Sequence, residues 1–191
     1  MLCSSSLQVG LFGSLYFSGV VVGFLFTSHL GDEYGRIFCI RLINIVRVIM
    51  FSVLLFAPLT LKGLYVFMFF FGMAFCLRVS NSYLYLHEVT TPQVSQVTTP
   101  ILNLMSMCPQ IIVPLVFWHL SKDWRTWVLA IYLLIISSLV ISMLMPESPL
   151  FLISKMRFRE AKESYNFMAK LNCRKKLNLE TDLLEEEVKL Q

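Results

Sequence analysis

The chain has 191 residues, of which 57% are hydrophobic and 15% are charged, and its formal net charge is +4. Its mean hydropathy of +0.70 is too high for a soluble domain, whose surface must be largely polar. Residues 1–31 and residues 89–121 contain no Lys, Arg, Asp or Glu. Each of these runs is longer than the roughly 20 residues that cross about 30 Å of hydrocarbon.

Five apolar segments are long enough to span a membrane. They cover residues 7–28, 40–58, 64–86, 97–120 and 127–145. Buried core helices can be equally apolar, but several of them in one short chain would leave no polar helix to face water. The first segment is not expected to be a cleaved signal peptide, because residues 1–7 carry no basic side chain. We therefore predict an all-α polytopic membrane bundle of about five transmembrane helices.

Basic residues favour one orientation of this bundle. The short connectors make neighbouring helices antiparallel, so the first connector and the tail share a side. That side holds Arg36, Arg41 and the nine basic residues after Pro149, whereas the other side has only Lys62, Lys122 and Arg125. Because Lys and Arg are retained in the cytoplasm during insertion, we predict a cytoplasmic tail and an external N-terminus. The sequence does not indicate which membrane holds the chain.

The character of the chain changes after Met145. Ser148 followed by Pro149 is typical of a helix start, with serine as the N-cap and proline at the first helical position. Apolar side chains then recur at steps of three and four residues, at Phe158, Ala161, Tyr165 and Met168. Arg159 and Glu163 are spaced for an exposed ion pair on the same helix. We predict a transmembrane domain at 1–146 and a cytoplasmic helical tail at 147–191, with a second, weaker helical pattern at 179–190.

The sequence gives no support for an enzyme. It has no Ser/His/Asp grouping on polar segments and no glycine-rich phosphate loop, and its histidines are only His29, His87 and His119. Its five cysteines are scattered, without the close pairs that metal sites require. We expect no catalytic residue, no cofactor, no metal and no nucleic-acid partner.

The connector at residues 28–36, which reads SHLGDEYGR, resembles a motif of the major facilitator superfamily, G-x-L-x-D-R-x-G-R. Asp32, Gly35 and Arg36 match the motif, as does Leu30, while Ser28 replaces the first glycine and Glu33 replaces the first arginine. In physical terms, Gly35 permits a tight turn, Asp32 offers a carboxylate to a neighbouring helix N-terminus, and Arg36 offers a charged partner. A charged turn between two helices would explain the same residues without this family.

Two further motifs resemble the organic cation transporter-like and sugar porter-like members of that superfamily. Glu88 followed by Pro92 fits the end of their fourth helix, although the basic residue that usually follows is missing. Residues 146–152, PESPLFL, and residues 157–161, RFREA, resemble their PESPRWL motif and the helix behind it. Leu150 stands where arginine is usual and Phe151 where tryptophan is usual.

The resemblance implies a cytoplasmic gating cluster that contains Asp32, Gly35, Arg36, Glu88 and Glu147. Because basic partners are missing at Glu33, Ser95 and Leu150, we expect this charge network to be weakened. The resemblance also implies that the chain covers the second to sixth helices of an N-terminal half and the start of the central loop, so we expect a partial carrier. The alternatives left open are a fragment, a pseudogene product and a genuine short protein.

Several polar residues inside the spans are candidates for lining a solute path. They are Arg78, Asn81, Tyr83, Asn103 and Gln110. Snorkelling, pairing with a buried acid and helix packing are the competing interpretations. Arg47, nearer its helix start, is expected to snorkel, and the Gly19 and Gly23 step is expected to mark close helix packing.

The sequence thus predicts a partial major facilitator-type transporter of small organic solutes, such as organic cations, organic anions or sugars. We expect it to be incompetent for transport alone and to need a second transporter half or a larger membrane complex. The alternative is a transport-inactive structural or regulatory membrane subunit derived from a transporter. Membrane lipid is an expected partner in either case, and the solute, the coupling ion and the oligomeric state are left open.

Overall fold

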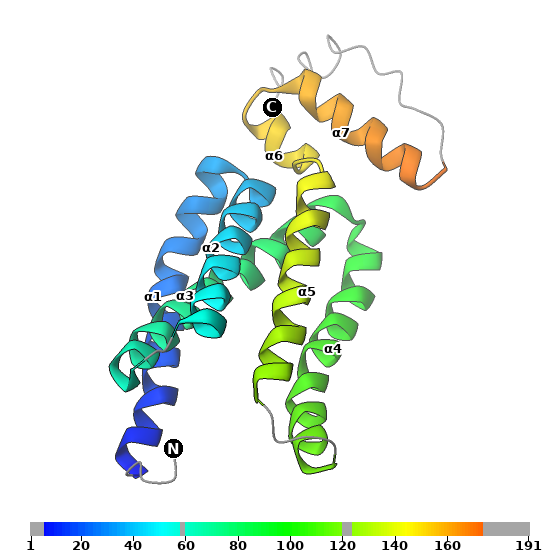
Figure 1. Cartoon of the computed structure of the whole chain (residues 1–191). Helices are drawn as coiled ribbons and strands as arrows, with labels where there is room; N and C mark the ends of the chain where they lie inside the picture. The colour runs from blue at the N-terminus through cyan, green and yellow to red at the C-terminus, as the bar shows by residue number, and fades with distance from the viewer. Residues whose placement is uncertain (1–5, 58–59, 120–123, 174–191) are drawn as a thin grey trace.

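The computed structural model describes residues 6–57, 60–119 and 124–173, with the side chains at 27, 28, 110, 116–119 and 124 left aside. Its described elements are all helical. They are α1 (Ser6–Tyr34), α2 (Arg36–Phe56), α3 (Leu61–Val89), α4 (Pro92–His119), α5 (Trp124–Leu144), α6 (Pro149–Ser154) and α7 (Phe158–Leu171). The first five are long and apolar enough to cross a membrane. The predicted all-α polytopic bundle is therefore confirmed (Figure 1).

The helices are longer than the predicted spans, and the connectors are correspondingly shorter. Gly35 alone separates α1 from α2, and residues 90 and 91 alone separate α3 from α4. The predicted spans 7–28, 40–58, 64–86 and 97–120 left longer polar connectors between the helices, and this was wrong. The spans were drawn to the thickness of hydrocarbon, but a helix satisfies its own backbone hydrogen bonds, so it can continue past the lipid into charged sequence.

Most large apolar side chains of the long helices lie on the outside of the bundle. Phe17 is 67% exposed, Leu25 is 74% exposed and Leu134 is 68% exposed. Exposed apolar area of this extent is unfavourable in water and favourable in a bilayer. These exposed apolar faces therefore suit contact with lipid or with other membrane helices.

The contacts between helices are built around α2 and α3. In Figure 1, α1, α2 and α3 form one group, α2 also packs against α5, and α6 and α7 lie across the end of α5. Ile43 of α2 packs with Ala74 and Leu77 of α3 to form the core of the first group. A smaller core of Phe151, Leu152 and Ala161 joins α6 to α7.

Small residues allow α1 and α3 to approach closely, as the Gly19 and Gly23 step predicted. A Cβ atom at Gly72 of α3 would clash with the carbonyl oxygen of Tyr16 on α1, and one at Gly19 would clash with the carbonyl oxygen of Phe69. Because both obstacles are backbone atoms, a side chain could be accommodated only by separating the two helices. Gly23 lies in the same contact, close to Met73.

Replacing Gly72 by alanine should destabilise the bundle by about 1–3 kcal/mol, the usual cost of overpacking a close contact. The expected readout is a lower Tm of the protein in detergent. Gly13→Ala is the matched control, because a Cβ atom there would meet nothing within 4 Å. Equal Tm values for the two variants would contradict the close approach of α1 and α3.

The predicted tail helix is also present. Ser148 accepts a hydrogen bond from the backbone N–H of Phe151 at 3.4 Å, and Pro149 occupies the first turn of α6. The exposed pair of Arg159 and Glu163 lies on α7 at 3.6 Å. The second helical pattern, at residues 179–190, lies outside the described residues.

Candidate functional site

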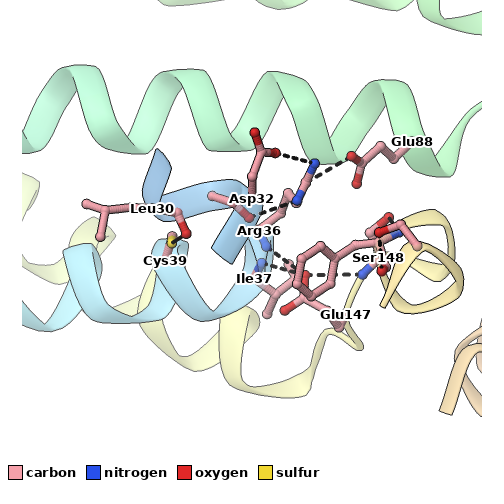
Figure 2. Close-up of polar contacts among 11 residues, drawn as sticks. Leu30, Asp32, Arg36, Ile37, Cys39, Glu88, Glu147 and Ser148 are labelled. Atoms are coloured by element: carbon pink, nitrogen blue, oxygen red, sulfur yellow. Dashed lines mark hydrogen bonds and ion pairs between the residues drawn. The ribbon is translucent and has the colours of Figure 1, made fainter. Parts of the chain in front are cut away.

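Three helix junctions meet at one end of the bundle and form a polar cluster. The α1–α2 junction contributes Asp32, Gly35 and Arg36, the end of α3 contributes Glu88, and the α5–α6 junction contributes Glu147 (Figure 2). We call this the Arg36 cluster, and the end of the bundle that holds it the Arg36 end. All five residues of the predicted gating motif are therefore brought together, although they are up to 115 positions apart in the chain, from Asp32 to Glu147.

The Arg36 side chain is the centre of this cluster. Its Nε donates to Oε1 of Glu88 at 2.9 Å, its Nη2 donates to Oδ1 of Asp32 at 2.9 Å, and its Nη1 donates to the carbonyl oxygen of Gly31 at 2.8 Å. The ring of Phe151 lies 4.9 Å from Cζ of Arg36. A guanidinium group suits this position because its donors diverge in one plane and can serve three acceptors at once.

Burial makes the two ion pairs of Arg36 unequal. The side chains of Arg36 and Glu88 are only 11% and 14% exposed, whereas that of Asp32 is 66% exposed. An exposed pair contributes about 0–1 kcal/mol, while breaking a buried pair leaves a charge without a partner and costs more. The pair that joins α2 to α3 is therefore the stronger link, and the pair with Asp32 adds little.

Gly35 makes the turn between α1 and α2 possible. Its φ is 102°, in the region that side chains rarely adopt. A Cβ atom at this position would also lie 2.8 Å from Oε2 of Glu147 and 3.0 Å from the ring of Phe151. Glycine therefore serves two purposes here, since it permits the turn and leaves room for the carboxylate.

Glu147 binds backbone rather than an arginine side chain. Its Oε1 accepts from the N–H groups of Arg36 and Ile37 at 2.8 and 2.9 Å, and its Oε2 accepts from that of Phe38 at 3.2 Å. Among the described residues, Glu147 has no ion pair with a basic side chain. It instead satisfies three of the amide groups that the first turn of α2 leaves without partners, where the helix dipole also favours an anion.

This arrangement corrects one expectation from the sequence. We expected Asp32 to offer its carboxylate to a neighbouring helix N-terminus, but Asp32 pairs with Arg36, and Glu147 occupies the N-terminus of α2. The reason is positional. Asp32 lies in the last turn of α1, four residues before Arg36, whereas the α5–α6 junction lies directly against the start of α2.

Further polar contacts that the sequence did not reveal hold the α5–α6 junction in place. Nε of Arg41 donates to the carbonyl oxygen of Ser142 at 2.9 Å, and its Nη2 donates to that of Met145 at 2.6 Å. Tyr85 donates to the carbonyl oxygen of Pro146 at 3.1 Å, and Ser164 of α7 donates to that of Glu147 at 2.9 Å. The sequence analysis counted Arg41 only as a basic residue on the cytoplasmic side, and its carbonyl partners could not be predicted.

The substituted positions of the motifs lie at the edge of this cluster. Glu33 pairs with His29 at 3.4 Å, and both side chains are largely exposed. Leu150 is 50% exposed, and Phe151 packs against Arg36. A single arginine therefore serves both Asp32 and Glu88. Whether the missing basic residues weaken the cluster stays a prediction.

The residues predicted to line a solute path do not form one group. Asn81 is 1% exposed, donates to the carbonyl oxygen of Leu77 at 2.8 Å and lies against Gly31 of α1, so it occupies a helix contact. The Tyr83 hydroxyl donates to Oδ1 of Asn103, which joins α3 to α4. Arg78 is half-buried. The side chain of Gln110 lies outside the described residues, and the lining role of the whole set stays a prediction.

We expected Arg47 to lie near the start of its helix, and this was wrong. Because α2 begins at Arg36, Arg47 lies eleven positions inside a helix of 21 residues. Among the described residues, neither Arg47 nor Arg78 forms an ion pair. Snorkelling of Arg47 stays a prediction.

The part of the chain that the structure describes contains no candidate metal site. No group of three or more His, Cys, Asp or Glu side chains there lies close enough to hold a metal ion. Cys39 and Cys76 are buried, whereas Cys108 and Cys173 are exposed, and all four are free thiols.

Five helices long and apolar enough to cross a membrane, tied together at one end by an ion cluster, are typical of an integral multi-pass membrane protein. A profile of the Sugar (and other) transporter family matches residues 2–189, and the chain therefore belongs to this family of the major facilitator superfamily. It is a family of transporters rather than of enzymes.

A curated relative supports the same assignment. The chain is 25% identical over 177 residues to solute carrier family 22 member 4 of Mus musculus. This similarity covers 90% of the chain but 31% of the relative, so the chain spans about a third of the relative's length.

Proposed function

We propose that the chain forms one bundle of a solute carrier for small organic solutes, and that it transports only together with a second bundle. The observation that carries this proposal is the match to a transporter family over residues 2–189, together with an Arg36 cluster that uses all five motif residues. The chain's correspondence to 31% of its mouse relative supports the need for further helices.

The mechanical argument concerns how a carrier exposes its solute alternately to each side. Family members rock one bundle against another around a site near the middle of the membrane. A single bundle has nothing to rock against. In this proposal the Arg36 cluster keeps α1, α2, α3 and α5 together at one end, so that the bundle moves as a unit.

We place the Arg36 end and the tail in the cytoplasm, with residues 1–146 as the membrane domain and 147–191 as the cytoplasmic part. Two observations support this orientation. Basic residues predominate on that side of the sequence, and Arg157, just before α7, and Arg159, on α7, are exposed at the same end of the bundle. The identity of the membrane is not part of the proposal.

The second candidate is a transport-inactive subunit that retains the fold. The substitutions at Glu33 and Leu150 favour it, because they replace basic residues that working members of the resembled subfamilies carry. Both candidates predict a partner protein in the membrane, so the two are separated by whether solute flux occurs.

A reconstitution experiment tests the proposal. We expect the purified chain in liposomes to show no saturable uptake of labelled glucose, tetraethylammonium or benzoate above protein-free liposomes. We expect the affinity-tagged chain, isolated in mild detergent from cells that produce it, to carry a second multi-pass protein, and the reconstituted pair to take up at least one of these solutes. Protease added to each face of sealed membranes should cleave the tail from the cytosolic face.

The possible contrary results are distinct. Saturable uptake by the chain alone would overturn the need for a second bundle. A stable complex that transports none of the three probes would favour the inactive subunit. Cleavage of the tail only from the opposite face would overturn the orientation.

A further inference from the structure

Two arginines lie inside the apolar helices α2 and α3, which pack against each other. Arg47 is eleven residues from the start of α2 at Arg36, and Arg78 is eleven residues from the end of α3 at Val89. These two helix ends are not level, because Ile43 packs on Ala74 and Leu77 while Asn81 lies against Gly31. Arg78 is therefore about one turn nearer the Arg36 end than Arg47. Both arginines lie within the apolar helices that can cross the membrane.

The packing of α2 on α3 directs Arg47 toward α3. Ile43 lies four residues before Arg47 and packs on Ala74 and Leu77, while Phe51 lies four residues after it and stacks edge-on against Phe67 and Phe71. Residues at steps of four share one face of a helix. Arg47 is therefore on the face of α2 that contacts α3, within reach of the turn that carries Arg78.

Both arginines are positively charged, and they lie on helices whose facing sides pack together through Ile43 and Phe51. Among the described residues, no acidic side chain pairs with either of them. No Asp or Glu occurs at residues 37–87, 89–122 or 124–146. The described acids nearest in sequence to the two arginines are therefore Asp32, Glu33 and Glu88. Within the described residues, Nε of Arg78 is buried without a hydrogen-bond partner, and no hydrogen bond or ion pair involves Arg47.

Such an arrangement is unfavourable unless an anion joins it. An arginine at the centre of a membrane helix costs about 2.5–3.5 kcal/mol on insertion scales, and a second one nearby adds repulsion. Nε of Arg78 is buried, but both side chains are only half-buried as a whole, so a ligand can reach their exposed parts. A carboxylate or phosphate can accept two parallel hydrogen bonds from a guanidinium group and would offset both the desolvation and the repulsion.

We propose that Arg47 and Arg78 form a binding site for an organic anion, such as a carboxylate or a phosphate ester, within the membrane-spanning part of the bundle. The inference rests on the proposed transport function in one respect: it takes the bound anion to be the solute that is transported. It narrows the solute class, because a sugar brings no charge to the site and a cation would be repelled by it.

Binding to the purified full-length chain in detergent tests the site directly. We expect benzoate and phenyl phosphate to bind saturably in calorimetric titration and to raise Tm, and tetraethylammonium and glucose to do neither. Arg47→Gln and Arg78→Gln should each weaken benzoate binding by about tenfold or more, the loss expected for a charge-assisted hydrogen bond. Arg159→Gln, which removes an exposed arginine on α7, should leave the affinity unchanged.

Stability without ligand provides a second measurement, which also shows whether the variants fold. Because each substitution removes an uncompensated charge, Arg47→Gln and Arg78→Gln should raise Tm in the absence of benzoate. Arg78→Lys keeps the charge but loses the planar guanidinium group, so this variant should bind benzoate with intermediate affinity.

Several results would overturn the site. One is benzoate binding that survives both substitutions. Another is a lower Tm in both glutamine variants, since this would reveal an existing partner. A third is benzoate binding by the purified chain but not by native membranes that contain it, since the arginines would then already be paired there.

The test of the anion site and the test of the proposed transport function can fail independently. Uptake of glucose or tetraethylammonium by the reconstituted complex, without benzoate binding, would leave transport standing and overturn the anion site. Arginine-dependent benzoate binding by a complex that transports nothing would support the site and contradict the carrier.

Discussion

Replacing Arg36 by glutamine is expected to lower the free energy of unfolding by about 3 kcal/mol, the lower end of the cost of breaking a buried ion pair. The substitution leaves Glu88, which is 14% exposed, without its cationic partner, and one of its oxygens already lacks a hydrogen bond among the described residues. The loss of Asp32 as a partner adds little, because that side chain is mostly exposed. Thermal or denaturant unfolding in detergent measures the change.

Arg36→Lys should produce an intermediate loss. A lysine keeps the charge, but its single ammonium group cannot reproduce the planar fork that reaches Gly31, Asp32 and Glu88 together. Arg157→Lys is the matched control, because Nε and Nη2 of Arg157 both donate to Glu160 but the pair is about half exposed. If Arg36→Lys and Arg157→Lys have the same small effect, Arg36 does not hold α2 against α3.

Replacing Glu147 by alanine should destabilise the protein by about 2–3 kcal/mol. Three backbone N–H groups at the start of α2 then lose a charged acceptor, and each such bond contributes about 1.5–3 kcal/mol before water and nearby groups replace part of it. Because the carboxylate joins the α5–α6 junction to α2, we also expect amide hydrogen exchange at residues 36–38 to accelerate.

Glu147→Gln separates the charge from the hydrogen bonds. It retains one carbonyl acceptor, so a loss smaller than that of the alanine variant is expected. Glu160→Ala is the control for removing an acid near the same end, because Glu160 is exposed and pairs only with Arg157 among the described residues. Unchanged exchange at residues 36–38 in Glu147→Ala would contradict its role as the cap of α2.

Features set by local sequence were predictable. The membrane spans followed from long runs without charge, since any charge there is costly whatever the tertiary structure. The cap at Ser148 followed from its position before Pro149, and the closeness of α1 and α3 followed from the spacing of Gly19 and Gly23. The membership of the Arg36 cluster followed from its motif resemblance, but its hydrogen bonds did not.

What could not be predicted depends on residues that meet only after folding. Glu147 reaches the start of α2 from 110 positions away, and its partners are backbone groups, which are the same for every amino acid. The predicted helix ends were wrong for a different reason. Charged residues such as Asp32 and Glu88 are accommodated in a helix once it has left the lipid. The position of Arg47 near the middle of α2 was missed for the same reason, since α2 begins four residues earlier than predicted.

The single-residue link at Gly35 has a mechanical consequence. A loop of several residues could lengthen to let two helices part, but one residue holds no slack, and its N–H and carbonyl groups are bound to Gly31 and Cys39. The C-terminal end of α1 and the N-terminal end of α2, which meet at Gly35, must therefore move together. Any displacement of α1 relative to lipid must be transmitted to α2 and, through Glu147, to α5, α6 and α7.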